Sequence, residues 1–282
     1  MLLFVTASAP ATVREEAFVQ DELTEMLANG ANFWVAPVRR HLDRPNDAAI
    51  ESGLATRTLI YQLLAPAVLG AAILQFARRP IAASRLLARV ITNAGGRRNL
   101  ATNLLSFPKG LWLARFVRKN AVSHIHAYWL AHTTSLAMVA AELGGCTWSA
   151  SAFRWDIDAD NCLSEKIRRA AFIRVADEFG LELIAARAKR ERPELPIALI
   201  RTGVAMPAGE EFVALPTVLE FCCAGAFVEK KAQGIVLGAF AQVHSKFPAT
   251  RLHFFGDGSL RERVELQAQT LQLQDVVEFH GT

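Results

Sequence analysis

Short apolar runs alternate with helix-type patterns along most of this 282-residue chain. Such runs, bounded by turn residues, predict buried strands, and the longer amphipathic stretches between them predict helices. The first strands are expected at Leu2–Thr6, Phe33–Val38, Val122–His126, Thr147–Ala152, Arg174–Ala176 and Ala198–Ile200, with helices at Arg14–Asn29, Thr133–Leu143, Glu165–Phe172 and Glu182–Arg190. The alternation favours a doubly wound α/β domain with a parallel sheet.

The pattern restarts after a polar, proline-bearing stretch, which predicts a linker at 207–216 between a domain at 1–206 and a domain at 217–282. Strands are expected there at Val218–Ala224, Arg251–Phe255 and Val276–Phe279, and helices at Gln233–Lys246 and Leu260–Leu271. Three strands and two helices correspond to half of a nucleotide-binding α/β domain. We therefore expect two Rossmann-type domains, the second incomplete.

Charge is unevenly distributed. The net charge is +4, yet the 90 residues from Ser52 to Ala141 contain 11 Lys and Arg and no Asp or Glu, so the other 192 residues sum to −7. This split favours an anionic partner for the basic stretch, such as lipid headgroups, nucleic acid or a phosphorylated ligand, with a solvated basic face as the alternative. Aromatic residues are not interleaved as in nucleic-acid-binding modules, so no nucleic-acid partner is expected.

A basic, apolar helical insert is expected at about 52–120. Within it, Thr58 to Ala77 is uncharged and long enough to span a bilayer, but Pro66, Gly70 and two glutamines interrupt it. A helix that lies on the membrane surface or in the core is favoured over a span. The stretch from Ile81 to Val90, with Arg85 and Arg89 four residues apart, is typical of a helix on an anionic membrane.

Composition excludes several other classes. Hydrophobic residues make up 52% and charged residues 21%, which is enough for a buried core and excludes general disorder. Four cysteines form no CxxC pair or ligand spacing, so neither a disulfide scaffold nor a structural zinc site is expected. The apolar run at Leu2–Val5 is too short for a signal peptide. We expect a cytoplasmic protein with reduced thiols.

Three segments of the second half share one order of motifs. Residues 222–240 are CCAGAFVEKKAQGIVLGAF, residues 247–263 are FPATRLHFFGDGSLRER, and residues 276–281 are VVEFHG. This order resembles the start of the C-terminal domain of glycosyltransferase family four, the retaining GT-B enzymes of bacterial polysaccharide assembly. The likeness extends over about 60 residues.

Four segments of the first half agree with this resemblance. HIHAYWLAHTTSLAMVAAELGG at 124–145 resembles the family's HIHAH segment, and the segment that begins SAFRWDI at 151 resembles its TAHRWDI. IRTGVAMP at 200–207 and EEAFVQDEL at 15–23 also resemble family segments. The gap in the resemblance is 50–110.

The resemblance implies transfer of a sugar, with retention, from a nucleotide-sugar donor to a polysaccharide or lipid-linked acceptor at the inner face of the cell membrane. It implies no metal or other cofactor, because the nucleotide-sugar is a substrate. A nucleotide-sugar epimerase of GT-B type is a rival whose motifs fit less well.

The implied donor site lies in the second domain. Lys231 corresponds to the lysine that binds the diphosphate, with Lys230 beside it, and Gly256, Asp257 and Gly258 lie along the nucleotide pocket. A cation and a helix N-terminus lower the barrier where charge develops on the leaving diphosphate. Solvated loop charges and simple turn chemistry are the alternatives for these residues.

On the acceptor side, the resemblance implicates Glu16, His126, Phe153 and Arg154, with Asp156 as a catalytic residue. His126 corresponds to a loop position facing the cleft, whereas His124 is expected to be structural. Asp156 has an alternative role as a helix cap.

Several positions depart from the family. Phe153 stands where the family has a histidine, Ala226 where it often has an arginine, and Ala232 where it has a glycine. The family's Glu-x7-Glu element would follow Thr282. The alternative hypothesis is therefore that the chain is a fragment, or an inactive, membrane-associated remnant that binds ligand without turnover. We expect the 282-residue chain alone to be inactive and to keep weak nucleotide affinity.

Overall fold

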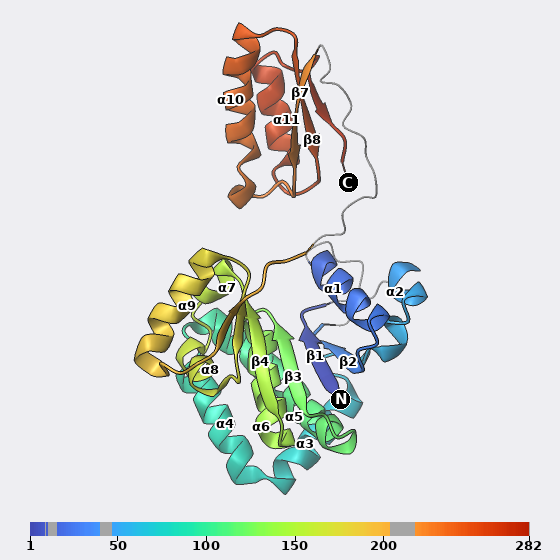
Figure 1. Ribbon diagram of the computed structural model, residues 1–282, viewed down its shortest axis with the longest axis vertical. Coiled ribbons are helices and arrows are strands. Elements are labelled where there is room, and N and C mark those ends of the chain that lie inside the picture. Colours follow the sequence, from blue (N-terminus) through green and yellow to red (C-terminus); the bar gives the residue numbers. More distant parts are fainter. Residues whose placement is uncertain (9, 11–15, 40–46, 204–217, 282) are drawn as a thin grey trace. The chain divides into compact units, whose positions relative to one another are not determined.

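The computed structural model describes residues 1–8, 10, 16–39, 47–203 and 218–281. The chain divides into two compact units, Met1–Met206 and Pro207–Thr282 (Figure 1). The expected linker at 207–216 lies outside the described residues. Each unit has a parallel sheet and a core of its own, so each is described by itself.

The first unit is built on a six-stranded sheet of order β2-β1-β3-β4-β5-β6. Every pairing is parallel, with Leu3 opposite Ile125 at the centre. The strands are β1 (Leu2–Thr6), β2 (Phe33–Pro37), β3 (His124–Tyr128), β4 (Thr147–Ala152), β5 (Ile173–Val175) and β6 (Ile197–Leu199). Because the order reverses between β1 and β3, the sheet is doubly wound, as predicted.

Helices and short turns connect these strands. They are α1 (Ala17–Ala28), α2 (Asp47–Glu51), the 3-10 turn η2 (Ala55–Arg57), α3 (Pro66–Arg78), α4 (Pro80–Thr92), α5 (Arg97–Lys119), α6 (His132–Gly144), α7 (Arg154–Asp158), α8 (Leu163–Arg169) and α9 (Glu178–Glu191). The sequence did not predict α2 or α7, which have only five residues each.

Two apolar clusters cover the two faces of the first sheet. On one face, Leu3, Ile125 and Ala150 pack against the long helices α5 and α6. On the other face, Phe4 and Tyr128 pack against α1. Side chains alternate between the two faces along a strand, and both faces are buried. A shift of one residue in strand pairing would therefore move apolar side chains to the wrong face, so burial fixes the register.

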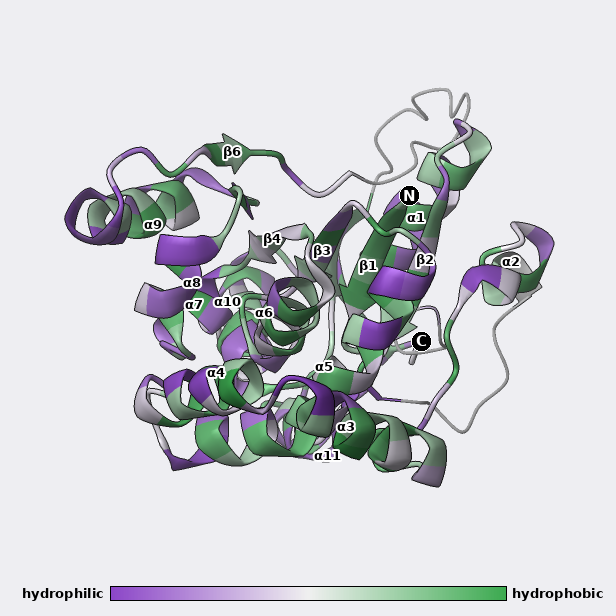
Figure 2. Cartoon of the chain, turned by 90° about the horizontal axis from the view of Figure 1, so that it is seen from below, coloured by the Kyte–Doolittle hydropathy of each residue, from purple (hydrophilic) through white to green (hydrophobic). Residues whose placement is uncertain are grey.

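The insert differs from the expected continuous helix at 58–77. Helix α3 begins only at Pro66, whose fixed φ suits the first turn of a helix, and Thr58–Ala65 is not helical. Figure 2 shows hydrophobic residues along α3 and hydrophilic residues interspersed on α4. Among the described residues, no helix is long and apolar enough to cross a membrane.

The second unit has three parallel strands in the order β7-β8-β9, with α10 and α11 packed on one face (Figure 1). Its elements are β7 (Leu219–Ala224), the 3-10 turn η3 (Glu229–Lys231), α10 (Gln233–Lys246), β8 (Thr250–Phe255), α11 (Arg261–Thr270) and β9 (Val277–Phe279). The predicted α/β class with two parallel sheets is confirmed.

Candidate functional site

The carboxyl ends of β1 and β3 flank the point where the strand order of the first sheet reverses. In open α/β sheets, ligands bind at this edge, because the loops there diverge and leave a crevice. The loop after β1 and the turn Trp129–His132 after β3 meet at this edge through Glu16 and Trp129.

Trp129 has a left-handed backbone, with φ of +73°. A bulky residue in this region is strained and persists only where its surroundings hold it. The hydroxyls of Thr133 and Thr134 both donate to the Trp129 carbonyl oxygen, at 2.6 and 2.7 Å. The turn is thus fixed in a conformation that sets the direction of the Trp129 ring.

Asp156 and Lys166 clamp the same turn from within the protein, and both are fully buried. The Asp156 carboxylate accepts the N–H of Leu130 at 2.5 Å and the N–H of Phe153 at 2.7 Å. The Lys166 ammonium donates to the carbonyl oxygens of Leu130 and Ala131, at 3.0 and 2.7 Å. Asp156 therefore joins the loops after β3 and β4, in addition to capping α7.

Burial dominates the electrostatics of this pair. It raises the pKa of Asp156 to about 7, against the opposing effect of the two N–H donors and of Lys166. It lowers the pKa of Lys166 to about 8, against the attraction of Cys162 and Asp156. With no exposed surface, the Asp156 carboxylate acts on a ligand only through the backbone that it holds.

Glu16 is also buried, at 3% exposed. Its carboxylate accepts the N–H groups of Ala7 and Ser8, the Ser8 hydroxyl and the Trp129 indole N–H. These contacts place Glu16 at the predicted edge of the sheet, where it organises the loop after β1 and the Trp129 ring.

Aromatic side chains form a cluster at this edge. The Phe153 ring lies 4.6 Å from Trp129 and 5.5 Å from Phe18, measured between centroids. Trp155 lies 5.4 Å from Trp129 and is 52% exposed. Arg154 is exposed, with its guanidinium 4.6 Å from the centre of the Phe179 ring. Phe153 and Arg154 thus belong to a partly open aromatic surface.

His126 lies in a strand, as the pattern at Val122–His126 predicted, and the loop position that the family resemblance implied for it is wrong. His126 lies in the middle of β3, because the strand continues to Tyr128. Its ring nitrogens bond to the hydroxyls of Ser149 and Ser151, and His124 bonds to Thr147 and Ser149 in the same way. Burial, with His124 and Arg174 nearby, lowers the pKa of His126 to about 3. Both histidines therefore join β3 to β4 as neutral rings.

His132 was not singled out in the sequence. It is the first residue of α6, and burial, with Arg39 and Lys166 nearby, lowers its pKa to about 4 despite Glu16. The imidazole is therefore neutral at pH 7 beside the Trp129 turn. A histidine directly after a strand end, at the start of a helix, is the signal that could have identified it.

In the second unit, glycines bring the loops after β7 and β8 together. A Cβ at Gly256 would lie 2.1 Å from the Gly225 carbonyl oxygen, and one at Gly258 would lie 2.6 Å from the Phe227 carbonyl oxygen. The Asp257 carbonyl oxygen accepts the Phe227 N–H at 2.9 Å. Only glycine permits this approach, so the Gly256–Gly258 turn is required by packing.

Lys231 ends the short turn η3, immediately before α10. Its alkyl chain lies along Gly225, with Cδ 3.6 Å from where a Cβ would be. Its ammonium group is exposed and has no partner within 218–281, and Lys230 is exposed beside it. The structure thus brings Lys231, Gly225 and the Gly256–Gly258 turn together at one end of the second sheet.

In sequence, the chain matches one family model, and the match lies in the second unit. Residues 214–282 match the sequence model of glycosyl transferases group 1. No curated protein matches the chain in sequence.

Solved structures resemble the chain in fold. The apo form of lipopolysaccharide outer core galactosyltransferase WaaB has a TM-score of 0.58 at 12% identity, covering 99% of this chain and 67% of that chain. Anabaena Alr3699/HepE in complex with UDP and glucose has a TM-score of 0.62 at 11% identity, covering 99% of this chain and 68% of that chain. S. aureus MnaA with UDP has a TM-score of 0.54 at 9% identity, with the same coverage. The chain spans about two thirds of the length of these structures, and its fold is GT-B-like.

Proposed function

Because residues 214–282 match the sequence model of glycosyl transferases group 1, we propose that this protein transfers a sugar from a UDP-sugar to a saccharide or lipid-linked acceptor, with retention. The proposal rests mainly on the Lys231 ammonium, which has no partner in the described part of the second unit and lies beside the close-packed glycine turn. UDP is chosen because it is bound in the Anabaena and S. aureus structures named above.

At the donor site, the UDP diphosphate binds at the N-terminus of α10. Free N–H groups there attract an anion, and Lys231 adds a full positive charge. As the bond between sugar and diphosphate breaks, negative charge grows on the diphosphate and these groups stabilise it. The Gly256–Gly258 turn packs on the backbone of the loop after β7, and this packing holds both loops beside Lys231 at one end of the sheet.

At the acceptor site, the aromatic surface of Trp129, Phe153 and Trp155 binds the saccharide. Aromatic rings offer a flat apolar face, which suits the C–H face of a sugar ring. Asp156 and Lys166 act as positioning residues, because they hold the strained turn that directs the Trp129 ring.

A panel of nucleotides tests the donor proposal. UDP should raise the midpoint of thermal unfolding more than UMP, because UMP lacks the second phosphate. GDP and ADP should raise it less than UDP. An equal effect of UMP and UDP would contradict a site for the diphosphate.

A non-catalytic protein that binds ligand without turnover is the second candidate. Two observations favour it: Phe153 packs into the aromatic cluster and cannot form a hydrogen bond to a sugar, and Ala226 supplies no second cation. Release of UDP from UDP-sugars, followed with and without saccharide acceptors, separates the two. UDP release by the chain excludes the second candidate.

We also propose that the protein lies on the cytoplasmic face of the cell membrane, bound through α3 and α4. Ile73 is 72% exposed and Ile81 is 68% exposed. Five of the eleven cations between Ser52 and Ala141 bind other parts of the first unit: Arg57, Arg79, Arg89, Lys109 and Arg118. The other six are exposed and have no partner among the described residues: Arg78, Arg85, Arg97, Arg98, Arg115 and Lys119.

Flotation with liposomes tests this membrane contact. Binding to vesicles with anionic lipid should weaken by about 1 kcal/mol for each cation removed from the surface. An Arg78→Gln, Arg85→Gln variant should therefore bind these vesicles more weakly by about 2 kcal/mol. An Ile73→Ser, Ile81→Ser variant should weaken binding through lost apolar burial. Lys189→Gln, Arg190→Gln on α9 is the control. Equal binding to neutral vesicles would contradict the electrostatic contribution.

A further inference from the structure

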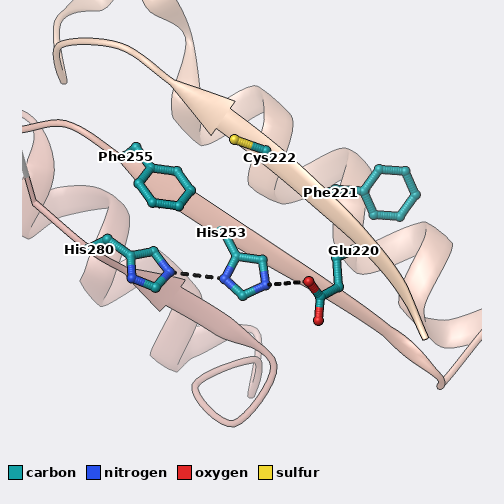
Figure 3. Close-up of a pocket in the computed structure, with 6 residues that line it drawn as sticks. All are labelled: Glu220, Phe221, Cys222, His253, Phe255 and His280. Atoms are coloured by element: carbon teal, nitrogen blue, oxygen red, sulfur yellow. Dashed lines mark hydrogen bonds and ion pairs between the residues drawn. The ribbon is translucent and has the colours of Figure 1, made fainter. Parts of the chain in front are cut away.

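One face of the second sheet carries no helix among the described residues. Helices α10 and α11 cover the face formed by Leu252, Phe254 and Val277. The alternate residues of the strands point to the other face, where they line a hollow of about 420 Å³ (Figure 3). Its lining residues on this face are Glu220, Cys222, His253, Phe255 and His280; Phe221 also borders the hollow, although its ring lies near Phe240 on the helix-covered side.

Three potential metal ligands meet at this hollow. His253 Nδ1 lies 3.0 Å from His280 Nε2, and Glu278 Oε2 lies 3.7 and 3.5 Å from these two atoms. Four ligands at the usual Zn–N and Zn–O distances form a tetrahedron with edges of about 3.3 Å. We propose that His253, Glu278 and His280 bind one divalent transition metal ion such as Zn²⁺, with a solvent molecule in the fourth position.

The strand register and neighbouring side chains hold the three ligands in place. The sheet register places His253 directly opposite Glu278, so the ligands come from adjacent strands without any change of backbone. The Phe255 ring stacks on His280 at 4.5 Å between centroids and 11° between planes, which orients that imidazole. Arg251 holds the other oxygen of Glu278 at 3.4 Å, leaving Oε2 toward the histidines.

An unsatisfied atom provides the second, independent indication. His253 Nε2 is buried and has no hydrogen-bond partner within residues 218–281, although Glu220 Oε2 lies 3.7 Å away (Figure 3). A ligating histidine commonly donates its other N–H to a carboxylate, which fixes the tautomer and makes the ligating nitrogen a better donor. With the proton on Nε2 facing Glu220, His253 Nδ1 accepts the 3.0 Å hydrogen bond from His280 Nε2, and a metal ion would replace the shared proton between these two nitrogens.

The ligand set determines which metal fits. Two imidazoles and one carboxylate favour Zn²⁺, Co²⁺, Ni²⁺ or Cu²⁺ over Mg²⁺ and Ca²⁺, which prefer oxygen ligands alone. None of the three ligands is Lys231 or a residue of the Gly256–Gly258 turn, although Gly281, next to His280, accepts the Gly256 N–H at 2.5 Å. The metal site is therefore an addition to the proposed sugar transfer.

Titration of the full chain with ZnCl₂ tests the site, with bound Co²⁺ followed by its visible absorption. We expect one equivalent of Zn²⁺, no competition from excess Mg²⁺, and weaker binding as pH falls because the histidines must be neutral. His253→Ala and His280→Ala should abolish this binding. Glu220→Gln should raise the Kd by about 10- to 100-fold, because it removes the partner of a ligand. His244→Ala, a histidine on α10, should leave the Kd unchanged.

Some results would overturn the proposal. One such result is that the wild-type chain shows no saturable Zn²⁺ binding. The other is that wild type and both histidine variants bind Zn²⁺ with the same Kd. If the histidine variants lose their native circular dichroism, Glu278→Gln and Glu220→Gln decide the matter in folded protein. An unchanged Kd in both glutamine variants would then refute the site.

Discussion

Buried Asp156 illustrates how one residue can determine the shape of a site that it does not reach. Asparagine at this position keeps the volume but offers only one acceptor oxygen, so one of the Leu130 and Phe153 N–H groups loses its partner. We predict that Asp156→Asn lowers the free energy of unfolding by about 1–3 kcal/mol, the usual cost of an unsatisfied buried donor. Urea unfolding measures it. Exposed Asp158→Asn is the control, and equal stability of both variants would refute the assigned role.

Ala232 marks a strained position beside Lys231. Its φ of +55° lies in the left-handed region, where a side chain is unfavourable and glycine is not. We predict that Ala232→Gly stabilises the second unit by about 0.5–1 kcal/mol. Thermal unfolding with Ala226→Gly as control measures the difference, since Ala226 does not have a positive φ. Loss of stability in Ala232→Gly would contradict the strain.

Single residues also show what could be predicted from the sequence. Lys231 and the Gly256–Gly258 turn could be placed because strand, turn and helix signals surround them. The buried roles of Asp156 and Lys166 could not, because they depend on carbonyl and N–H groups of Leu130 and Ala131, which are distant in sequence. His126 was expected at the end of a strand but lies in its middle, because local pattern does not determine where a short strand ends.

At the scale of elements, β3 and β4 are joined by neutral histidines. The folded His126 ring has a pKa of about 3, whereas an unfolded histidine has about 6.5. The unfolded chain therefore takes up a proton first, and the stability that His126 contributes is present above pH 6.5 and lost as pH falls toward 3. Asp156 has the opposite effect on stability between pH 7 and 4. Because its pKa is raised in the folded protein, the folded state takes up a proton first, and this uptake stabilises the fold as pH falls.

We predict that stability falls between pH 6.5 and 4, at up to about 1.4 kcal/mol per pH unit for each neutral histidine, and more steeply in Asp156→Asn. Urea midpoints across this range measure the fall. Nuclear magnetic resonance of the ring protons should show no titration of His126 above pH 4. Titration near 6.5 in the folded protein would contradict the buried, neutral ring.

The elements of the insert were only partly predictable. A basic, helical region was expected at about 52–120, and α3, α4 and α5 lie there. The sequence alone could not show that Lys109 is buried, with its ammonium donating to the Pro37, Val38 and Tyr61 carbonyl oxygens. Burial lowers the pKa of Lys109 to about 8. Part of the positive charge is thus internal, and only the six exposed cations can take part in the proposed membrane contact.

At the scale of the whole molecule, the alternation of strands and helices was sufficient to predict two parallel α/β sheets. Alternation determines topology because a right-handed crossover leaves few ways to connect parallel strands. It does not determine chemistry, since the same fold serves many reactions. The motifs around Lys231 and Gly256–Gly258 suggested the family resemblance, and residues 214–282 match the corresponding family model.

Calorimetric titration of the full chain with UDP tests the central claim most directly. We predict that UDP binds the wild-type protein saturably. In Lys231→Ala the free energy of UDP binding should be weaker by about 1.5–3 kcal/mol, the usual contribution of a hydrogen bond to a charged group. Lys246→Ala, at the far end of α10, should bind UDP as wild type does. No UDP binding by the wild-type chain, or equal binding by Lys231→Ala, would contradict a donor site at Lys231.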